Sequence, residues 1–293
     1  MGKMIPKIIY TCWLSDLGTM PEKIKMLVES QLRYHNDYQH VIIDYDKFSE
    51  IRSEVPAWVN KSYENGDYAH VSDYLRAYYL YNYGGIYLDS DVMQVPKQNI
   101  FDKYLDYEFF GNIEVSTNYY GVHDIMGDQY MYRTAKPIDL NRAAFQYSFR
   151  RDIEEHIPNA AERESFVKDQ YDFIKSFKYG IAIDGAMFGA AKGCEVLGDV
   201  LDMQSSRMFE KYSDYGNIIK SVHYFPNICH IIAKCMEKYG FTYEYQYGKQ
   251  YILNDGEYML NTNRFISVTD YLNRENSRCE LIHYCEGSWR DKE

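Results

Sequence analysis

The sequence predicts an α/β protein with a mostly parallel central sheet and flanking helices. Over the first 95 residues, short apolar runs typical of strands alternate with helical patterns. This β-α-β-α-β order favours parallel strands, because each helical crossover returns the chain to the same edge of the sheet. With 293 residues, of which 46% are hydrophobic, the chain is long enough to bury an ample core.

The first elements can be placed from apolar runs and from proline. Pro21 favours the start of a helix, since proline is tolerated in the first turn, and Pro56 separates two short helices. These elements are expected in the following order: a strand at 7–13, a helix at 21–34, a strand at 39–44, and short helices at 48–55 and 57–63.

A helix that ends at two glycines follows. Asp73 and Arg76 are three residues apart in this helix, so they share one face and present an acid beside a base. Gly84 and Gly85 are expected to end the helix, because glycine adopts the left-handed conformation of a helix C-terminus without strain.

The next strand, expected over 86–92, ends in an Asp-x-Asp tripeptide. Alternation along a strand would point Tyr87, Asp89 and Asp91 to one side. Two acids at a strand edge, beside a helix with an acid and a base, suggest a site for a divalent cation and a polyhydroxylated anionic ligand.

The remaining elements are expected as a strand at 107–114, helices within 141–179, a small-residue loop at 181–192, a helix at 194–204 and a strand at 279–285. No linker or internal repeat divides the chain. A single domain over 1–293 is therefore expected, with a helical insertion at about 120–180 that would form the acceptor side.

Composition excludes some classes of function. The net charge of −11 argues against nucleic acid as a partner, because phosphate binding requires a basic face. The six cysteines include no Cys-x-x-Cys pair, and reduced thiols in a cytoplasmic protein are the simplest explanation. We expect no signal peptide and no membrane-spanning segment, since no apolar run is long enough.

An Asp-x-Asp tripeptide is weak evidence alone, because about two are expected by chance in a chain so rich in aspartate. The chain has two of them. Asp44 and Asp46 follow a predicted strand and precede a loop, where aspartate is common as a cap or turn residue. Asp89 and Asp91 differ because of the residues that precede them.

The block Ser-Asp-x-x-Arg at 72–76, followed by Tyr-Gly-Gly-Ile-Tyr-Leu-Asp-x-Asp at 83–91, resembles the sugar-binding region of the Asp-x-Asp glycosyltransferases of family 32. That family includes bacterial capsule and lipopolysaccharide sugar transferases and yeast Golgi mannosyltransferases. The block is also similar to the catalytic domain of the large clostridial glucosylating toxins. The opening at 5–13 resembles the family's first strand, although Tyr10 stands where the family more often has His, and 283–289 resembles its C-terminal element.

The resemblance implies a GT-A fold, a nucleotide-sugar donor that is expected to be a UDP-sugar, Mn²⁺ or Mg²⁺ as cofactor, and transfer with retention. It implies that Trp13 stacks on the base, that Tyr87 lines the ribose or base side, and that Asp73 and Arg76 bind the sugar hydroxyls. Asp89 would contact ribose and sugar and reach the metal through water, and Asp91 would bind the metal. His283 and Ser288 would contact metal or diphosphate, and Trp289 would close over the phosphate.

Asp184 is a further candidate. It follows a short apolar run and precedes small residues, and a small-residue loop would let a substrate approach the backbone. A turn with a helix N-cap explains the same pattern equally well. Asp184 therefore joins Asp89 and Asp91 as a candidate catalytic residue, on the acceptor or sugar side.

No carboxylate can be assigned from the sequence as a nucleophile, so a front-face retaining route is preferred to double displacement. The implied partners are a nucleotide-sugar donor and a saccharide acceptor of capsule or cell-surface polysaccharide synthesis. Three alternatives stay open: a protein acceptor as in the toxin-like relatives, a non-catalytic carbohydrate-binding protein, and a sugar nucleotidyltransferase. The last would need a basic loop after Trp13, which the chain lacks. A lipid-linked acceptor and peripheral association with the inner face of the cell membrane also remain open.

Overall fold

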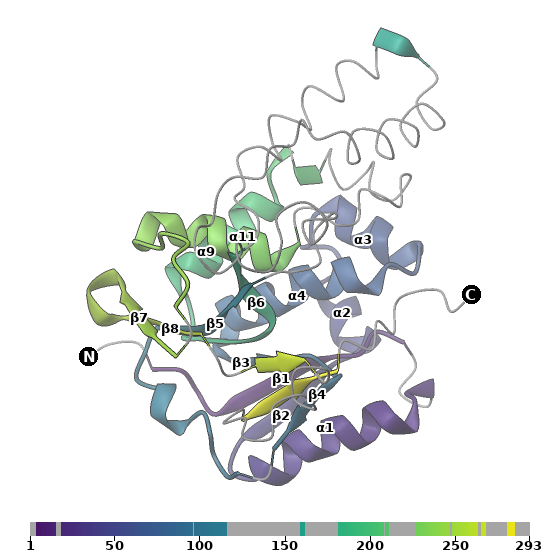
Figure 1. Cartoon of the computed structure of the whole chain (residues 1–293). Helices are drawn as coiled ribbons and strands as arrows, with labels where there is room; N and C mark the ends of the chain where they lie inside the picture. Colours follow the sequence, from purple (N-terminus) through teal and green to yellow (C-terminus); the bar gives the residue numbers. More distant parts are fainter. Residues whose placement is uncertain are drawn as a thin grey trace.

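The computed structural model in Figure 1 describes residues 4–15, 19–95, 97–115, 159–161, 181–207, 209–210, 227–246, 248–262, 265–267 and 280–284. The predicted insertion at 120–180 lies outside the described residues, apart from 159–161. The main described elements are β1 (Ile8–Cys12), α1 (Glu22–Tyr34), β2 (Gln39–Ile43), α2 (Tyr45–Ile51), α3 (Ala57–Glu64), α4 (Tyr68–Tyr83), β3 (Gly85–Leu88), β4 (Val92–Gln94), β5 (Phe109–Val115), β6 (Ile181–Ala190), α9 (Glu195–Gln204), α11 (Ile228–Met236), β7 (Gln250–Leu253), β8 (Tyr258–Asn261), β9 (Phe265–Ser267) and β10 (Leu281–His283).

The described strands of the main sheet are ordered β2-β1-β3-β6-β5-β8-β7. β1 pairs in parallel with β2 and β3, and β5 pairs in parallel with β8. β6 is antiparallel to both of its neighbours, and β7 is antiparallel to β8. Five of these seven strands therefore run in one direction, which confirms the predicted α/β class with a mostly parallel sheet.

Helices cover one face of the sheet, and α1 lies on the other side (Figure 1). Alternation along the strands divides the buried side chains between two cores. Tyr10 and Phe109 pack toward α4, α9 and α11, whereas their neighbours Ile9 and Phe110 belong to the opposite core. None of the described helices combines the length and apolar character that a membrane crossing requires.

A second sheet has the order β4-β10-β9, and α1 packs against its β4 strand. The continuous strand expected over 86–92 is wrong. β3 ends at Leu88, and the Val92 N–H donates to the Asp89 carbonyl at 3.1 Å, which closes a turn before β4 begins. The chain leaves one sheet and enters the other at this turn, so the two acids lie in the turn rather than on alternate positions of one strand.

The small-residue loop expected at 181–192 is also wrong, because Ile181–Ala190 is the long buried strand β6. Gly189 lies in this strand because a Cβ there would overlap the ring of Phe110 on β5. Glycine at this position makes room for a cross-strand aromatic ring and does not mark a loop.

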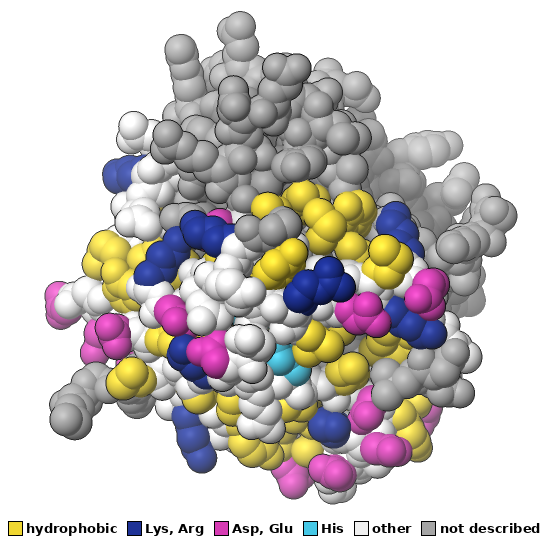
Figure 2. Space-filling view, turned by 90° about the horizontal axis from the view of Figure 1, so that it is seen from below, with side chains coloured by type: hydrophobic (Ala, Val, Ile, Leu, Met, Phe, Trp, Pro, Cys, Tyr) yellow, Lys and Arg dark blue, Asp and Glu magenta, His cyan; other side chains and the backbone are white. Residues whose placement is uncertain are grey.

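The predicted helix stop at Gly84 is confirmed. Gly84 has φ of +72°, and its N–H donates to the Leu80 carbonyl at 2.8 Å. Asp44 is confirmed as a helix cap, since its side chain accepts from the Lys47 N–H. On the face seen in Figure 2, acidic and basic side chains lie close to one another instead of gathering by sign.

Candidate active site

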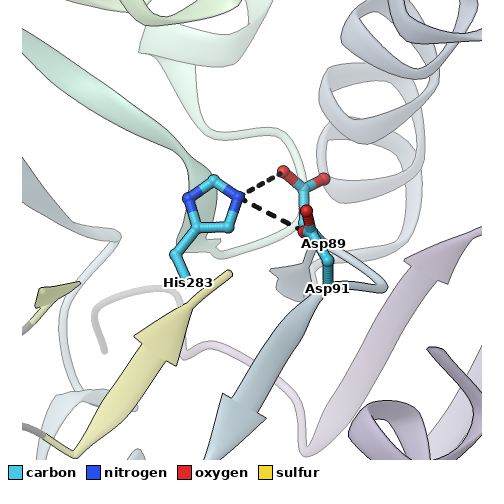
Figure 3. A group of neighbouring side chains, drawn as sticks. All are labelled: Asp89, Asp91 and His283. Carbon is cyan, nitrogen blue, oxygen red and sulfur yellow. Dashed lines mark ion pairs between the residues drawn. The ribbon is translucent and has the colours of Figure 1, made fainter. Parts of the chain in front are cut away.

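Three potential metal ligands meet where β3 ends and the second sheet begins (Figure 3). Nε2 of His283, at the end of β10, lies 3.2 Å from Asp91 Oδ1 and 4.0 Å from Asp89 Oδ2. Each residue offers one ligand atom, and these atoms lie within 4.8 Å of one another. The structure therefore brings together the three residues predicted as metal ligands.

The turn that carries the two acids is fixed from both sides. The buried Gln31 of α1 donates from Nε2 to the carbonyls of Asp89 at 3.0 Å and Val92 at 2.7 Å. The Tyr284 N–H donates to the Asp91 carbonyl at 3.0 Å, and β10 pairs with β4 so that His283 lies opposite Val92. Backbone and α1 contacts thus hold the acids near the histidine before any ligand binds.

Arg76 connects α4 to the acids. Arg76 is only 7% exposed, and its Nη1 donates to the Gly185 carbonyl at 2.6 Å. Its Nη2 donates to Ser72 Oγ at 3.0 Å and lies 3.2 Å from Asp73 Oδ1 and 3.4 Å from Asp89 Oδ1. Buried charge requires this kind of pairing, so the Asp73–Arg76 pair is not a solvated surface salt bridge.

Tyr87 lies beneath this guanidinium and supports Asp89. The Arg76 guanidinium carbon is 4.6 Å from the centre of the Tyr87 ring. The Tyr87 hydroxyl donates to Asp89 Oδ1 at 2.7 Å and lies 3.0 Å from Ser72 Oγ. One carboxylate oxygen of Asp89 is therefore occupied by Tyr87 and Arg76, while the other faces His283.

Asp73 also ties α4 to α11. Its Oδ2 accepts from the Ile228 N–H at 3.2 Å, and this N–H belongs to the first turn of α11. Burial raises the pKa of the Asp73 carboxyl above its usual value, while the neighbouring Arg76 opposes this shift.

Asp184 lies in β6 and is 5% exposed. Its Oδ1 accepts from the Ala186 N–H at 2.9 Å, a local contact within the strand and not the helix cap considered as the alternative. Burial raises the pKa of Asp184, and His283 opposes that shift. The structure thus places Asp184 near His283 and Asp89.

Of the other residues predicted to bind the donor, the structure describes Trp13 but not Ser288 or Trp289. Trp13, just past β1, packs against the apolar cluster of α1 that Met93 and Tyr284 also contact. This puts Trp13 on the side of the second sheet. Ser288 and Trp289 lie outside the described residues.

Sequence reasoning missed Glu114, Gly185 and Cys229. Glu114 interacts electrostatically with Asp184, and the Gly185 carbonyl accepts from Arg76. No local pattern marks these residues, because their positions depend on pairing between distant strands and on where α11 begins.

The ligand atoms of Asp89, Asp91 and His283 are of types that bind divalent cations. Carboxylate oxygens suit Mg²⁺ and Mn²⁺, and an imidazole nitrogen suits Mn²⁺ better than Mg²⁺. Three protein ligands leave coordination positions for phosphate oxygens and water. The donor set among the described residues therefore fits a divalent cation that also binds a substrate.

Comparisons with known proteins agree with the sequence resemblance. Residues 2–147 match the family model described as "Capsular polysaccharide synthesis protein". This match includes the block at 72–91, and it confirms the resemblance of that block to capsule-type sugar transferases.

The chain is also similar to "Inositol phosphoceramide mannosyltransferase 3" of Schizosaccharomyces pombe, with 35% identity over 89 residues, which are 30% of this chain and 24% of that protein. The chain thus matches about a quarter of the length of this curated relative. The family match and this relative support a glycosyltransferase of the capsule-synthesis type.

Two solved structures have some likeness to the chain. One is "PaToxG Glycosyltransferase", with 16% identity, coverage of 80% of this chain and 70% of that one, and a TM-score of 0.43. The other is a glycosyltransferase involved in the glycosylation of the major capsid of PBCV-1, with 12% identity, coverage of 96% and 94%, and a TM-score of 0.41.

Proposed function

We propose that this chain, whose residues 2–147 match the capsular polysaccharide synthesis family, transfers a sugar from a UDP-sugar to a saccharide acceptor in capsule or cell-surface polysaccharide synthesis. The observation that carries the proposal is the cluster of Asp89, Asp91 and His283 next to the buried Arg76. We place it in the cytoplasm, with a GT-A type of donor site.

In this proposal, Asp89, Asp91 and His283 hold Mn²⁺ or Mg²⁺. The bound cation would neutralise the charge that develops on the diphosphate leaving group. Arg76 and Tyr87 orient Asp89, and the α1 contacts of Gln31 keep the turn in place. Trp13 would stack on the base from the side of the second sheet, and Ser288 and Trp289 would complete the diphosphate site.

Transfer would proceed with retention by a front-face route. Double displacement requires a carboxylate that is free to attack the anomeric carbon. Asp184 is a candidate for that role, but its carboxylate accepts from the Ala186 N–H and is largely buried. We assign Asp184 to the acceptor or sugar side, and Asp73 and Arg76 to the sugar hydroxyls.

The test is hydrolysis and transfer with UDP-glucose, UDP-galactose, UDP-N-acetylglucosamine and GDP-mannose, with Mn²⁺, with Mg²⁺ and with EDTA. We expect the protein to hydrolyse one of these donors, and only when Mn²⁺ or Mg²⁺ is present. Asp91→Asn should reduce the rate of hydrolysis at least about 100-fold through loss of the cation. Asp46→Asn, in the other Asp-x-Asp tripeptide, is the matched control and should keep full activity.

Three outcomes would contradict the proposal or its acceptor. Metal-dependent activity retained in Asp91→Asn would rule out this metal site. Binding of glycans without metal, together with no hydrolysis of any donor, would instead identify a carbohydrate-binding protein. Transfer to a protein in place of a saccharide would support the toxin-like alternative.

A further inference from the structure

Glu114 lies on the same face of the main sheet as Asp184. Glu114 of β5 pairs with Ala182 of β6, and Asp184 is two residues further along β6. Their neighbours Ile113 and Ile183 point into the core beneath α4 and α11. Alternation therefore places the two carboxyl groups together on the other face, as diagonal neighbours that long side chains can bridge.

The start of α11 packs against the other face of β6, behind this pair. A Cβ on Gly185 would lie 2.6 Å from the Ile228 side chain and 3.0 Å from Cys229 Sγ, so α11 packs directly against the β6 backbone. Burial raises the pKa of the Cys229 thiol well above its usual value. The thiol thus stays neutral beside the acid pair.

The acid pair borders the proposed metal site without belonging to its ligands. Asp184 interacts electrostatically with His283, Asp89 and Arg76, and Glu114 interacts with His283. Among the described residues, the group that could hold a cation comprises Asp89, Asp91 and His283. This group marks independently where a ligand would bind, next to the acid pair.

The charge of the pair indicates which part of a nucleotide-sugar could lie against it. Two adjacent carboxyl groups would repel a diphosphate but can accept hydrogen bonds from hydroxyl groups. Burial and the nearby Asp184 raise the pKa of Glu114 to about 7. Glu114 is half-buried, so its carboxyl group can accept a hydrogen bond from a ligand.

We propose that Glu114 is a specificity-determining residue of the donor pocket, where its carboxyl oxygen accepts a hydrogen bond from a hydroxyl group of the donor hexose. This assignment rests on the proposed function. It deepens that function by naming the residue on β5 that would distinguish sugars by the position of a hydroxyl group.

The experiment compares Glu114→Gln with the wild type, using UDP, the UDP-hexose that is turned over fastest, and its monodeoxy derivatives, all with Mn²⁺. We expect Glu114→Gln to lower kcat/KM for the UDP-hexose about 10- to 100-fold, and to change UDP affinity less than about twofold. With the wild type, kcat/KM for one monodeoxy donor should fall by a similar factor relative to the UDP-hexose. With Glu114→Gln, kcat/KM for that donor should be little lower than for the UDP-hexose, because both changes remove the same hydrogen bond.

Glu108→Gln is the matched control. Glu108 is a buried acid just before β5, and it accepts from the Glu195 N–H, a role that glutamine can keep. Melting temperatures of both variants measure any loss of folding.

Intact UDP binding with an unchanged sugar preference in Glu114→Gln would overturn the assignment of Glu114 and leave the proposed function standing. Equal losses for UDP and for the UDP-hexose would also overturn it. Absence of metal-dependent UDP binding by the wild type would overturn the proposed function, and this assignment with it.

Discussion

At the scale of single residues, the polar side chains of the candidate site bind one another before they bind a ligand. Spacing alone predicted that Asp73 and Arg76 share a helix face, and their ion pair at 3.2 Å agrees with it. Spacing did not predict that Arg76 also contacts Gly185 of β6 and Asp89 in the turn. Arg76 therefore couples the helix to the acids, in addition to any contact that it makes with a sugar.

Tyr87→Phe tests this coupling. The change removes the hydroxyl that donates to Asp89 but keeps the ring beneath Arg76. We expect Mn²⁺ affinity to fall about 10-fold, because residues that orient metal ligands typically contribute this much. The measurement is Mn²⁺ binding by calorimetry.

Tyr258→Phe is the control for that prediction, since the buried Tyr258 hydroxyl has no hydrogen-bond partner among the described residues and lies in β8. It should leave Mn²⁺ affinity unchanged. Equal Mn²⁺ affinity in Tyr87→Phe and the wild type would show that Asp89 needs no support from Tyr87.

At the scale of elements, the glycines between α4 and β3 set the angle between the two halves of the site. Gly84 has φ of +72°, and a Cβ there would lie 2.8 Å from both the Lys192 nitrogen and the Pro6 ring. The segments before β1 and after β6 thus pack directly against the end of α4. Both the backbone conformation and the space require glycine.

We expect Gly84→Ala to lower the free energy of unfolding by about 2–4 kcal/mol, since it combines backbone strain with a steric overlap. Gly193→Ala is a matched control: Gly193 has φ of +69°, but its Cβ would meet nothing within 4 Å. It should cost only about 1 kcal/mol, from strain alone. Urea unfolding measures both, and equal losses would show that packing at Gly84 is not important.

At the scale of the whole molecule, stability depends in part on a buried histidine that lies away from the site. His35 is fully buried at the end of α1, stacks on Phe101, and its Nε2 lies 3.3 Å from Gln94 Oε1. Burial lowers the pKa of His35 to about 4, from a usual value of 6.5. The unfolded chain takes up a proton below pH 6.5 that folded His35 does not, so the stabilisation from neutral His35 is lost as pH falls from 6.5 toward 4.

His35→Gln isolates this effect, because glutamine does not titrate. We expect the variant to be less stable than the wild type at pH 7.5, and the difference in free energy of unfolding to shrink by about 1–3 kcal/mol on going to pH 4.5. The comparison is needed because Glu114, whose pKa is raised to about 7, acts in the opposite direction over the same range. A difference that stays constant with pH in urea unfolding would contradict the prediction.

The sequence by itself determined the α/β class, the helix that carries Asp73 and Arg76, and the stop at Gly84. These features depend on residues a few positions apart, where periodicity and backbone preference act directly. It also separated Asp44, expected as a cap or turn residue, from Asp89, expected as a site residue, through the residues that precede each one.

Only the tertiary structure decided that Asp89 and Asp91 lie in a turn between two sheets, that His283 faces them from β10, and that Glu114 lies beside Asp184. These positions follow from hydrogen-bond register between segments far apart in the chain. No local propensity encodes that register, because it forms only when distant apolar faces are buried together.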